Sequence, residues 1–309
     1  METLKTIQAS FKSGNITKPE YIDRMHEVHR TIFQYADFLR GTDIERLEIA
    51  DGRVLATIRG SGIQLVCDPE DKRIAPVEIM NFGNYETPDY SMVRRLVPEG
   101  GTVLDVGANI GYYTLSLCRQ VRDVKVHSFE PIPKTFALLQ EHVKINGATN
   151  ATIHNFGFSD REETKTFYYY PEGSGNASSA NLSEGTSVRT ITCQVKRLDD
   201  FVQANGLRVD FIKCDVEGAE LFVFRGAIAT LKRDRPVLFT EMLRKWAAKF
   251  NYHPNEIIAL MKDLGYGCYC EHQGKLKPFT SMDENTAETN FFFLHPEQHA
   301  AKLAELVSQ

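Results

Sequence analysis

The stretch Thr102-Val103-Leu104-Asp105-Val106-Gly107-Ala108-Asn109-Ile110-Gly111 decides the fold of this chain. Its first half is a short, almost entirely apolar run, which predicts a strand buried on both faces. Two glycines follow, and apolar residues at helical spacing begin directly after Gly111. A strand, a glycine turn and a helix in this order are typical of an open α/β sheet.

Further buried strands are expected along the rest of the chain, at residues 124–129, 151–156, 209–214 and 236–240. Helical patterns lie between these strands, so we expect a parallel sheet with right-handed crossovers. Runs 266–270 and 290–294 have no helix between them and predict a terminal antiparallel pair. Runs 165–170 and 188–195 predict two extra strands around a flexible insertion rich in Gly, Ser and Asn, residues 171–187.

Residues 1–81 are expected to form an N-terminal extension, and residues 82–309 the main domain. The extension reads as helices up to about Gly41, followed by short β-prone runs that predict a small antiparallel patch. It carries no chemical motif. Three roles therefore stay open for it: a lid over the site, a contact in a homodimer, or packing against the sheet.

The composition weighs against several classes of protein. The formal net charge is −5, without the basic excess of nucleic-acid binders, so we expect no nucleic-acid partner. No apolar run is long enough for a membrane helix, and the first residues lack a secretion signal, so we expect a cytoplasmic protein that binds no membrane. The six cysteines are scattered, which argues against a zinc site.

The glycine loop has features that suit an amino-acid ligand. Gly107 and Gly111 allow close approach of the backbone, and the next helix offers free N–H groups to a carboxylate. Asp105 places an anion where an amino group could sit. A dinucleotide turn needs Gly-x-Gly-x-x-Gly, but Asn109 and Tyr112 occupy its second and third glycine positions, which argues against NAD or FAD.

Acidic residues follow the next two predicted strands. Glu130 ends the second strand, where a carboxylate commonly binds ribose hydroxyls. Asp160 follows the third strand and could accept a hydrogen bond from an adenine amino group, with Phe158 against the ring. A turn cap is an equally good interpretation of Asp160. Together with the glycine loop, Glu130 favours an adenosine ligand without pyrophosphate, and S-adenosylmethionine has this structure.

Two carboxylates are candidates for the chemical step. Asp215 and Glu217 follow the fourth strand and could remove the proton of an acceptor hydroxyl. Alternatively, Asp215 orients the amino group of the donor and Glu217 favours the start of the next helix. His253 is a weaker candidate base. Asp215 and Glu241 could together hold a magnesium ion, although we expect a reaction without a metal.

Three motifs together resemble the FkbM family of methyltransferases, over about residues 82–296: Leu104–Thr114, Phe129-Glu130-Pro131 and Ile212–Glu220. The resemblance implies a seven-stranded Rossmann-like methyltransferase sheet. It also implies methyl transfer from S-adenosylmethionine to a hydroxyl oxygen of a small molecule such as a sugar or a polyketide. It extends the expected donor contacts to Glu86, Tyr112, Pro131 and Ser159. A non-catalytic donor-binding module, a nitrogen acceptor and a macromolecular acceptor stay open as alternatives.

Overall fold

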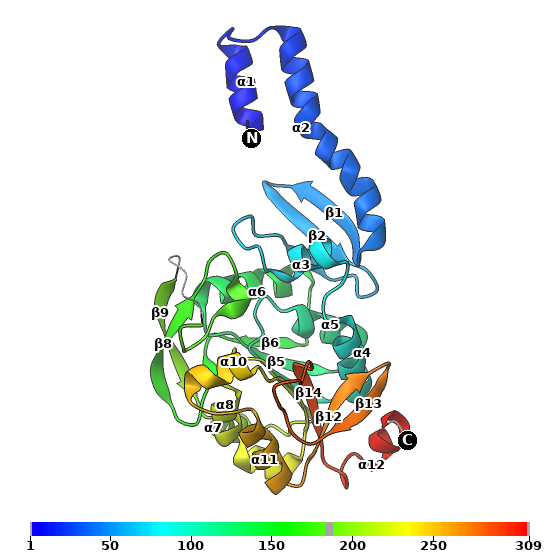
Figure 1. Ribbon diagram of the computed structural model, residues 1–309, viewed down its shortest axis with the longest axis vertical. Coiled ribbons are helices and arrows are strands. Elements are labelled where there is room, and N and C mark those ends of the chain that lie inside the picture. Colours follow the sequence, from blue (N-terminus) through cyan, green and yellow to red (C-terminus); the bar gives the residue numbers. More distant parts are fainter. Residues whose placement is uncertain (1, 183–187, 308–309) are drawn as a thin grey trace.

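The structure is a computed structural model that describes residues 2–182 and 188–307. Figure 1 shows an α/β body from which a helical hairpin projects. The main sheet has the strand order β13-β12-β14-β11-β10-β4-β5-β6. The predicted Rossmann-like α/β sheet is confirmed, but it has eight strands instead of seven. The additional strand, β13, forms a hairpin with β12 at one edge.

Five strands of this sheet are parallel, namely β4 (Thr102–Val106), β5 (Lys125–Phe129), β6 (Ala151–His154), β10 (Phe211–Cys214) and β11 (Val237–Glu241). Three antiparallel strands complete it, namely β12 (Gly267–His272), β13 (Lys275–Phe279) and β14 (Asn290–Leu294). The predicted terminal pair is confirmed, because β12 pairs with β14. The chain runs from β4 outward through β5 and β6, then returns to β10, so the switch point lies between β4 and β10.

Both faces of the sheet are buried, which explains why its strands are apolar throughout. The helices of the body are α3 (Ala75–Phe82), α4 (Thr87–Leu96), α5 (Tyr112–Gln120), α6 (Pro133–Ile145), α7 (Leu198–Ala204), α8 (Glu220–Arg225), α9 (Ile228–Asp234), α10 (Arg244–Ala247), η3 (Ala248–Phe250), α11 (Asn255–Asp263) and α12 (Ala300–Leu306). Val103 and Phe211 belong to one core, against α4 and α5, and Leu104 and Ile212 to another, against α8, α9 and α11.

A second, small sheet lies beside the main one. It consists of β7 (Gly157–Phe158), β9 (Arg189–Lys196) and β8 (Glu163–Tyr169), so the two extra strands predicted around the insertion are confirmed. Between β8 and β9 the structure describes residues 170–182 and residue 188, and we call residues 171–182 the strap. The strap contains one turn of helix, η2 (Ser174–Asn176), and Ser178 bridges to β8. Residues 183–187 of the predicted insertion lie outside the described part of the chain.

The N-terminal extension has two parts. The hairpin consists of α1 (Leu4–Lys12) and α2 (Lys18–Phe38), with Thr17 and Glu20 forming a capping box at the start of α2. After η1 (Leu39–Gly41), the predicted antiparallel patch forms as β1 (Ile44–Ala50), β2 (Arg53–Ile58) and β3 (Gln64–Val66). This patch shares an apolar core with Ile110 and Leu115 of the main body. Within the described residues, no helix is long and apolar enough to cross a membrane.

Candidate functional site

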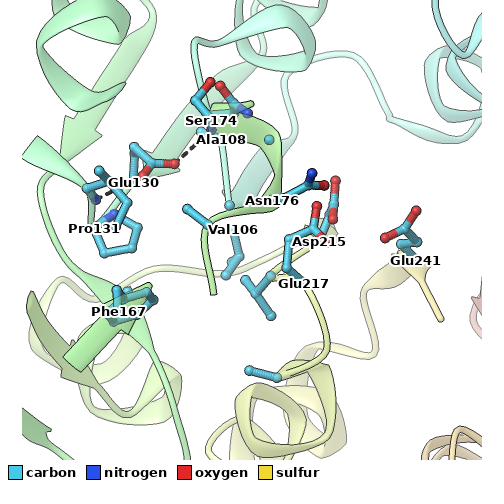
Figure 2. Close-up of a pocket in the computed structure, with 18 of the residues that line it drawn as sticks. Val106, Ala108, Glu130, Pro131, Phe167, Ser174, Asn176, Asp215, Glu217 and Glu241 are labelled. Atoms are coloured by element: carbon cyan, nitrogen blue, oxygen red, sulfur yellow. Dashed lines mark hydrogen bonds between the residues drawn. The ribbon is translucent and has the colours of Figure 1, made fainter. Parts of the chain in front are cut away.

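A cavity of about 570 Å³ opens at the carboxyl ends of β4, β5, β10 and β11. In the view of Figure 2, Glu130, Pro131 and Phe167 lie on one side, and Glu241 lies on the opposite side. The predicted donor residues that line this cavity are Glu86, Gly107, Asn109, Tyr112, Glu130, Pro131 and Ser159. It lies at the switch point of the sheet, where ligands bind in open α/β folds.

The two glycines of the loop after β4 are required by its geometry. Gly107 has a φ of +78°, and a Cβ there would lie 1.8 Å from the carbonyl oxygen of Asp215. Gly111 has a φ of +92°, and a Cβ there would lie 2.5 Å from Leu139 Cδ1. Gly107 therefore brings the loop against the end of β10. Gly111 does not line the cavity, contrary to the prediction, and instead lets α5 begin against α6.

Glu130 combines two functions at the end of β5. Its carboxylate accepts hydrogen bonds from the backbone N–H of Asn109, at 3.0 Å, and of Ile132, at 2.9 Å. Burial raises the pKa of Glu130 to about 7, although the backbone hydrogen bonds favour its charged form. Each carboxylate oxygen keeps a second acceptor position. Glu130 thus fixes the glycine loop and still presents acceptors to the cavity.

Asp105 departs from its predicted role. It is fully buried and does not line the cavity. Its Oδ2 accepts a 2.6 Å hydrogen bond from the Thr114 hydroxyl, and its Oδ1 lies 3.6 Å from Lys213 Nζ. Asp105 therefore supports the start of α5 through Thr114, and its side chain does not reach the cavity in this structure.

Asp160 also departs from its predicted donor contact. Ser159 lines the cavity, but Asp160 does not. The Ser159 hydroxyl donates to Asp160 Oδ1 at 3.3 Å, and Lys165 Nζ donates to the same hydroxyl oxygen at 2.8 Å. The side chain of Asp160 therefore contacts Ser159, which lines the cavity, but does not line the cavity itself. Phe158 does line the cavity, as expected for a side chain that meets a ring.

Lys213 is a site residue that the sequence analysis missed. It is buried, donates to the carbonyl oxygen of Gly107 at 2.8 Å and lies 3.3 Å from Asp215 Oδ2. Burial disfavours its charge, but the carboxylates of Asp215 and Asp105 hold the pKa of Lys213 above its ordinary value. The signal was one lysine within an otherwise apolar strand, because such a charge needs buried partners.

Four carboxylates occupy the part of the cavity farthest from Glu130. Single oxygens of Asp215, Glu217 and Glu241 all lie within 4.8 Å of one another. Figure 2 shows Asp215 and Glu217 side by side, with Glu241 beyond them. Burial and the neighbouring charge of Asp215 raise the pKa of Glu217 and of Glu241 well above the ordinary range. Glu86 accepts a 2.6 Å hydrogen bond from Tyr113, and burial raises the pKa of Glu86 to about 7.

The turn after β10 holds Glu217 in an uncommon conformation. Glu217 has a φ of +54°, in the left-handed region that costs a residue with a Cβ about 1–2 kcal/mol. Buried Glu220 stabilises this turn, because its carboxylate accepts from the N–H of Val216 and of Gly218. Glu217 Oε2 is sealed from solvent and has no hydrogen-bond partner in the described residues. Such a strained, unsatisfied group is typical of a functional site.

The strap crosses the cavity and joins two distant parts of the chain. The backbone N–H and the hydroxyl of Ser174 both donate to Asp71, a buried residue of the N-terminal extension. The Ser178 hydroxyl donates to the carbonyl oxygen of Glu217 at 2.8 Å. The strap therefore couples the extension to the turn that carries Glu217. His253, the weaker candidate base, does not line the cavity and accepts from the N–H of Asn255.

Comparison with known proteins identifies a family match. The sequence model described as "Methyltransferase FkbM domain" matches residues 105–268, more than half of the chain. Methyltransferase 1 of Beauveria bassiana is 28% identical over 147 residues, which cover 42% of this chain and 59% of that protein. Methyltransferase sdnD of Sordaria araneosa is 28% identical over 160 residues, which cover 42% and 61%. This chain thus matches about three fifths of the length of each relative.

Solved structures give a weaker likeness. Methyltransferase FkbM from Methylobacillus flagellatus KT has a TM-score of 0.41 and 16% identity, over 69% of this chain and 52% of that one. A SAM-dependent O-methyltransferase from Thermotoga maritima has a TM-score of 0.37 and 15% identity, over 77% and 76%. At these values the likeness adds nothing to the description of the site.

Proposed function

Because the chain belongs to the FkbM methyltransferase family, we propose that it transfers the methyl group of S-adenosylmethionine to a hydroxyl oxygen of a small acceptor, such as a sugar or a natural product. The observation that carries this proposal is the layout of one cavity. Glu130 lies on one side of it and the carboxylates of Asp215, Glu217 and Glu241 lie on the other, with Val106 and Ala108 between them. A donor with an adenosine end and a reactive end needs this arrangement.

The donor is assigned by the chemistry of the lining. The ribose hydroxyls would donate to the free acceptor positions of Glu130, and the adenine ring would lie between Pro131 and Phe158. The methionine end would follow the glycine loop toward Asp215, where Gly107 leaves room for the backbone to approach. Backbone N–H groups at the start of α5 suit its carboxylate.

The chemical step is a displacement at the methyl carbon. The acceptor oxygen forms a bond to this carbon while the carbon–sulfur bond breaks, and the electron pair of that bond goes to sulfur, leaving neutral S-adenosylhomocysteine. The hydroxyl proton goes to a carboxylate. Alignment of oxygen and methyl group contributes about 7–11 kcal/mol in well-oriented reactions. A positioned base adds roughly 10²–10⁴-fold in rate.

Glu217 is the favoured base of the two candidates. Asp215 forms an ion pair with Lys213 at 3.3 Å, whereas Glu217 Oε2 has no hydrogen-bond partner in the described residues. The raised pKa of Glu217 also makes its ionised form the stronger proton acceptor. Asp215 then has a positioning function at the end of β10, because it holds Lys213 and, through Lys213, the glycine loop.

The test uses the full chain with purified donor compounds. Calorimetry should show binding of S-adenosylhomocysteine and no binding of NAD, and the opposite result would contradict the proposed donor. In an assay of S-adenosylhomocysteine release with an acceptor panel, Glu217→Gln should lose turnover and keep donor affinity. If no acceptor reacts although the donor binds, the chain is a binding module. Assays with and without a chelator show whether the three clustered carboxylates use magnesium.

A further inference from the structure

The end of the cavity around Glu217 contains more carboxyl groups than cationic side chains. We call this region the acceptor end; its carboxylates are Glu86, Asp215, Glu217 and Glu241, and its cations are Lys213 and Lys245. Lys213 is shared with Asp105, which lies behind the loop, and with the carbonyl oxygen of Gly107. Lys245 lies over the Trp246 ring, 4.2 Å from its centre. The acceptor end therefore holds more acid than its own cations can neutralise.

The donor brings only part of the positive charge that this region can accept. S-adenosylmethionine carries a sulfonium, an ammonium and a carboxylate, so it brings one net positive charge. Burial opposes the ionisation of Glu86, Glu217 and Glu241, and Glu217 Oε2 has no hydrogen-bond partner in the described residues. A second cation among these groups would stabilise their ionised forms, whereas a neutral acceptor brings no charge to oppose the burial.

We propose that the acceptor carries a protonated amine, as in an amino sugar or an amino alcohol, and that this amine binds between Asp215, Glu217 and Glu241. The inference rests on the proposed function, because it describes the acceptor of the same site. An ammonium group has three N–H donors, and three carboxylates surround the space it would fill. Their oxygens lie within 4.8 Å of one another, so N–H···O distances of about 2.7–3.2 Å can be reached without rearrangement.

This binding mode also has a consequence for the base. The amine would stabilise the ionised form of Glu217 against the burial that opposes it. Glu217 would then be ready to receive the proton of a hydroxyl on the carbon next to the amine. Binding of the amine would therefore also activate the base, so neutral acceptors would react more slowly as well as bind more weakly.

The experiment compares matched acceptors on the full chain. Methyl α-glucosaminide is paired with methyl α-glucoside and with its N-acetyl derivative, and 2-aminocyclohexanol is paired with 1,2-cyclohexanediol. S-adenosylhomocysteine release gives kcat/KM for each. We expect kcat/KM of each amine to exceed that of its neutral partner by about tenfold or more, because the ammonium forms hydrogen bonds to charged groups. Glu241→Gln should reduce this advantage, and Glu162→Gln, which alters an exposed carboxylate outside the cavity, should leave it unchanged.

The outcomes separate this inference from the proposed function. If the neutral partners react equally well or better, the proposed recognition of an amine is wrong. The same holds if no aminated member of the panel reacts. If a chelator abolishes the reaction and magnesium restores it, the carboxylates bind a metal and the inference is wrong. Failure of S-adenosylhomocysteine to bind in calorimetry contradicts the proposed function itself. Methyl transfer to the nitrogen, seen by NMR of the product, contradicts only the oxygen acceptor.

Discussion

A Cβ at Gly107 would lie 1.8 Å from the carbonyl oxygen of Asp215, so the glycine loop and the end of β10 are in direct backbone contact. The loop is also held by Glu130, through the N–H of Asn109, and by Lys213, through the carbonyl oxygen of Gly107. The position of Asp215 therefore depends on the residue that occupies position 107.

Gly107→Ala should consequently reduce donor affinity and turnover together. The added methyl group must push the loop away from backbone atoms that cannot rotate aside, and the φ of +78° adds strain. We expect a loss of at least about tenfold in affinity for S-adenosylhomocysteine, measured by calorimetry. Gly147→Ala is the matched control, since that glycine also has a positive φ but has open space around it. Unchanged affinity in Gly107→Ala would show that the loop does not define the donor site.

Lys213→Met should destabilise the fold. Removal of the ammonium leaves buried Asp105 without its cation, and breaking a buried ion pair in this way costs about 3–5 kcal/mol. Thermal unfolding should show a large decrease in Tm. The double variant Lys213→Met/Asp105→Asn should recover part of this stability without recovering activity. If the double variant is no more stable than Lys213→Met, the pair is not coupled.

The contribution of Glu220 to stability should decrease as the pH rises from about 4.5 to about 7. Burial raises the pKa values of Glu86, Glu130 and Glu220 from 4.5 to about 7, so the folded state holds protons that the unfolded state releases in this window. This stabilisation is complete below pH 4.5 and is lost as the pH passes 7. Buried histidines such as His154 and His299, with pKa values lowered to about 4, contribute the opposite slope, so the measurement compares Glu220→Gln with the parent protein. Relative to the parent, the Tm of Glu220→Gln should rise across this range, and a Tm difference that does not change with pH would contradict the assignment.

The N-terminal hairpin is expected to mediate a homodimer. Among the described residues, the large apolar side chains that are exposed all lie in the first 82 positions, and Ile32 (56% exposed), Phe33 (67%) and Phe38 (52%) share the second half of α2. Acidic and basic residues are interspersed along α2, so neither sign of charge dominates the surface that would meet a second copy. Light scattering should give twice the mass of one chain, and Phe33→Asp should give monomers. Glu27→Gln is the control, and a monomeric parent protein would refute the dimer.

The sequence predicts the sheet better than it predicts the side-chain contacts. Apolar strands such as 102–106 are recognised because burial on both faces leaves no alternation, and β12 and β14 because no helix separates them. The strand β13 was missed because Lys275–Phe279 is short and contains Pro278, and a proline weakens a strand prediction although an edge strand tolerates it.

Site residues were predicted by strand-end position, which does not fix the direction of a side chain. Glu130 and Glu217 follow their strands and reach the cavity, but Asp105 lies within β4 and points behind the loop. Successive side chains of a strand point to opposite faces of the sheet, so a shift of one residue turns a side chain to the other face. Lys213 was missed because its role in the site depends on ion pairs, and one partner, Asp105 of β4, is distant from it in the sequence.

The strap imposes an order on events at the site. Ser174 and Gly175 lie above the glycine loop, with Gly175 next to Asn109, whereas Glu241 stands at the far side of the cavity. The strap is anchored to Asp71 and thus covers the loop proposed to hold the methionine end of the donor. We expect the donor to bind first and the acceptor to approach over it. Steady-state kinetics should be sequential and ordered, with S-adenosylhomocysteine the last product released. It should inhibit competitively against the donor and noncompetitively against the acceptor.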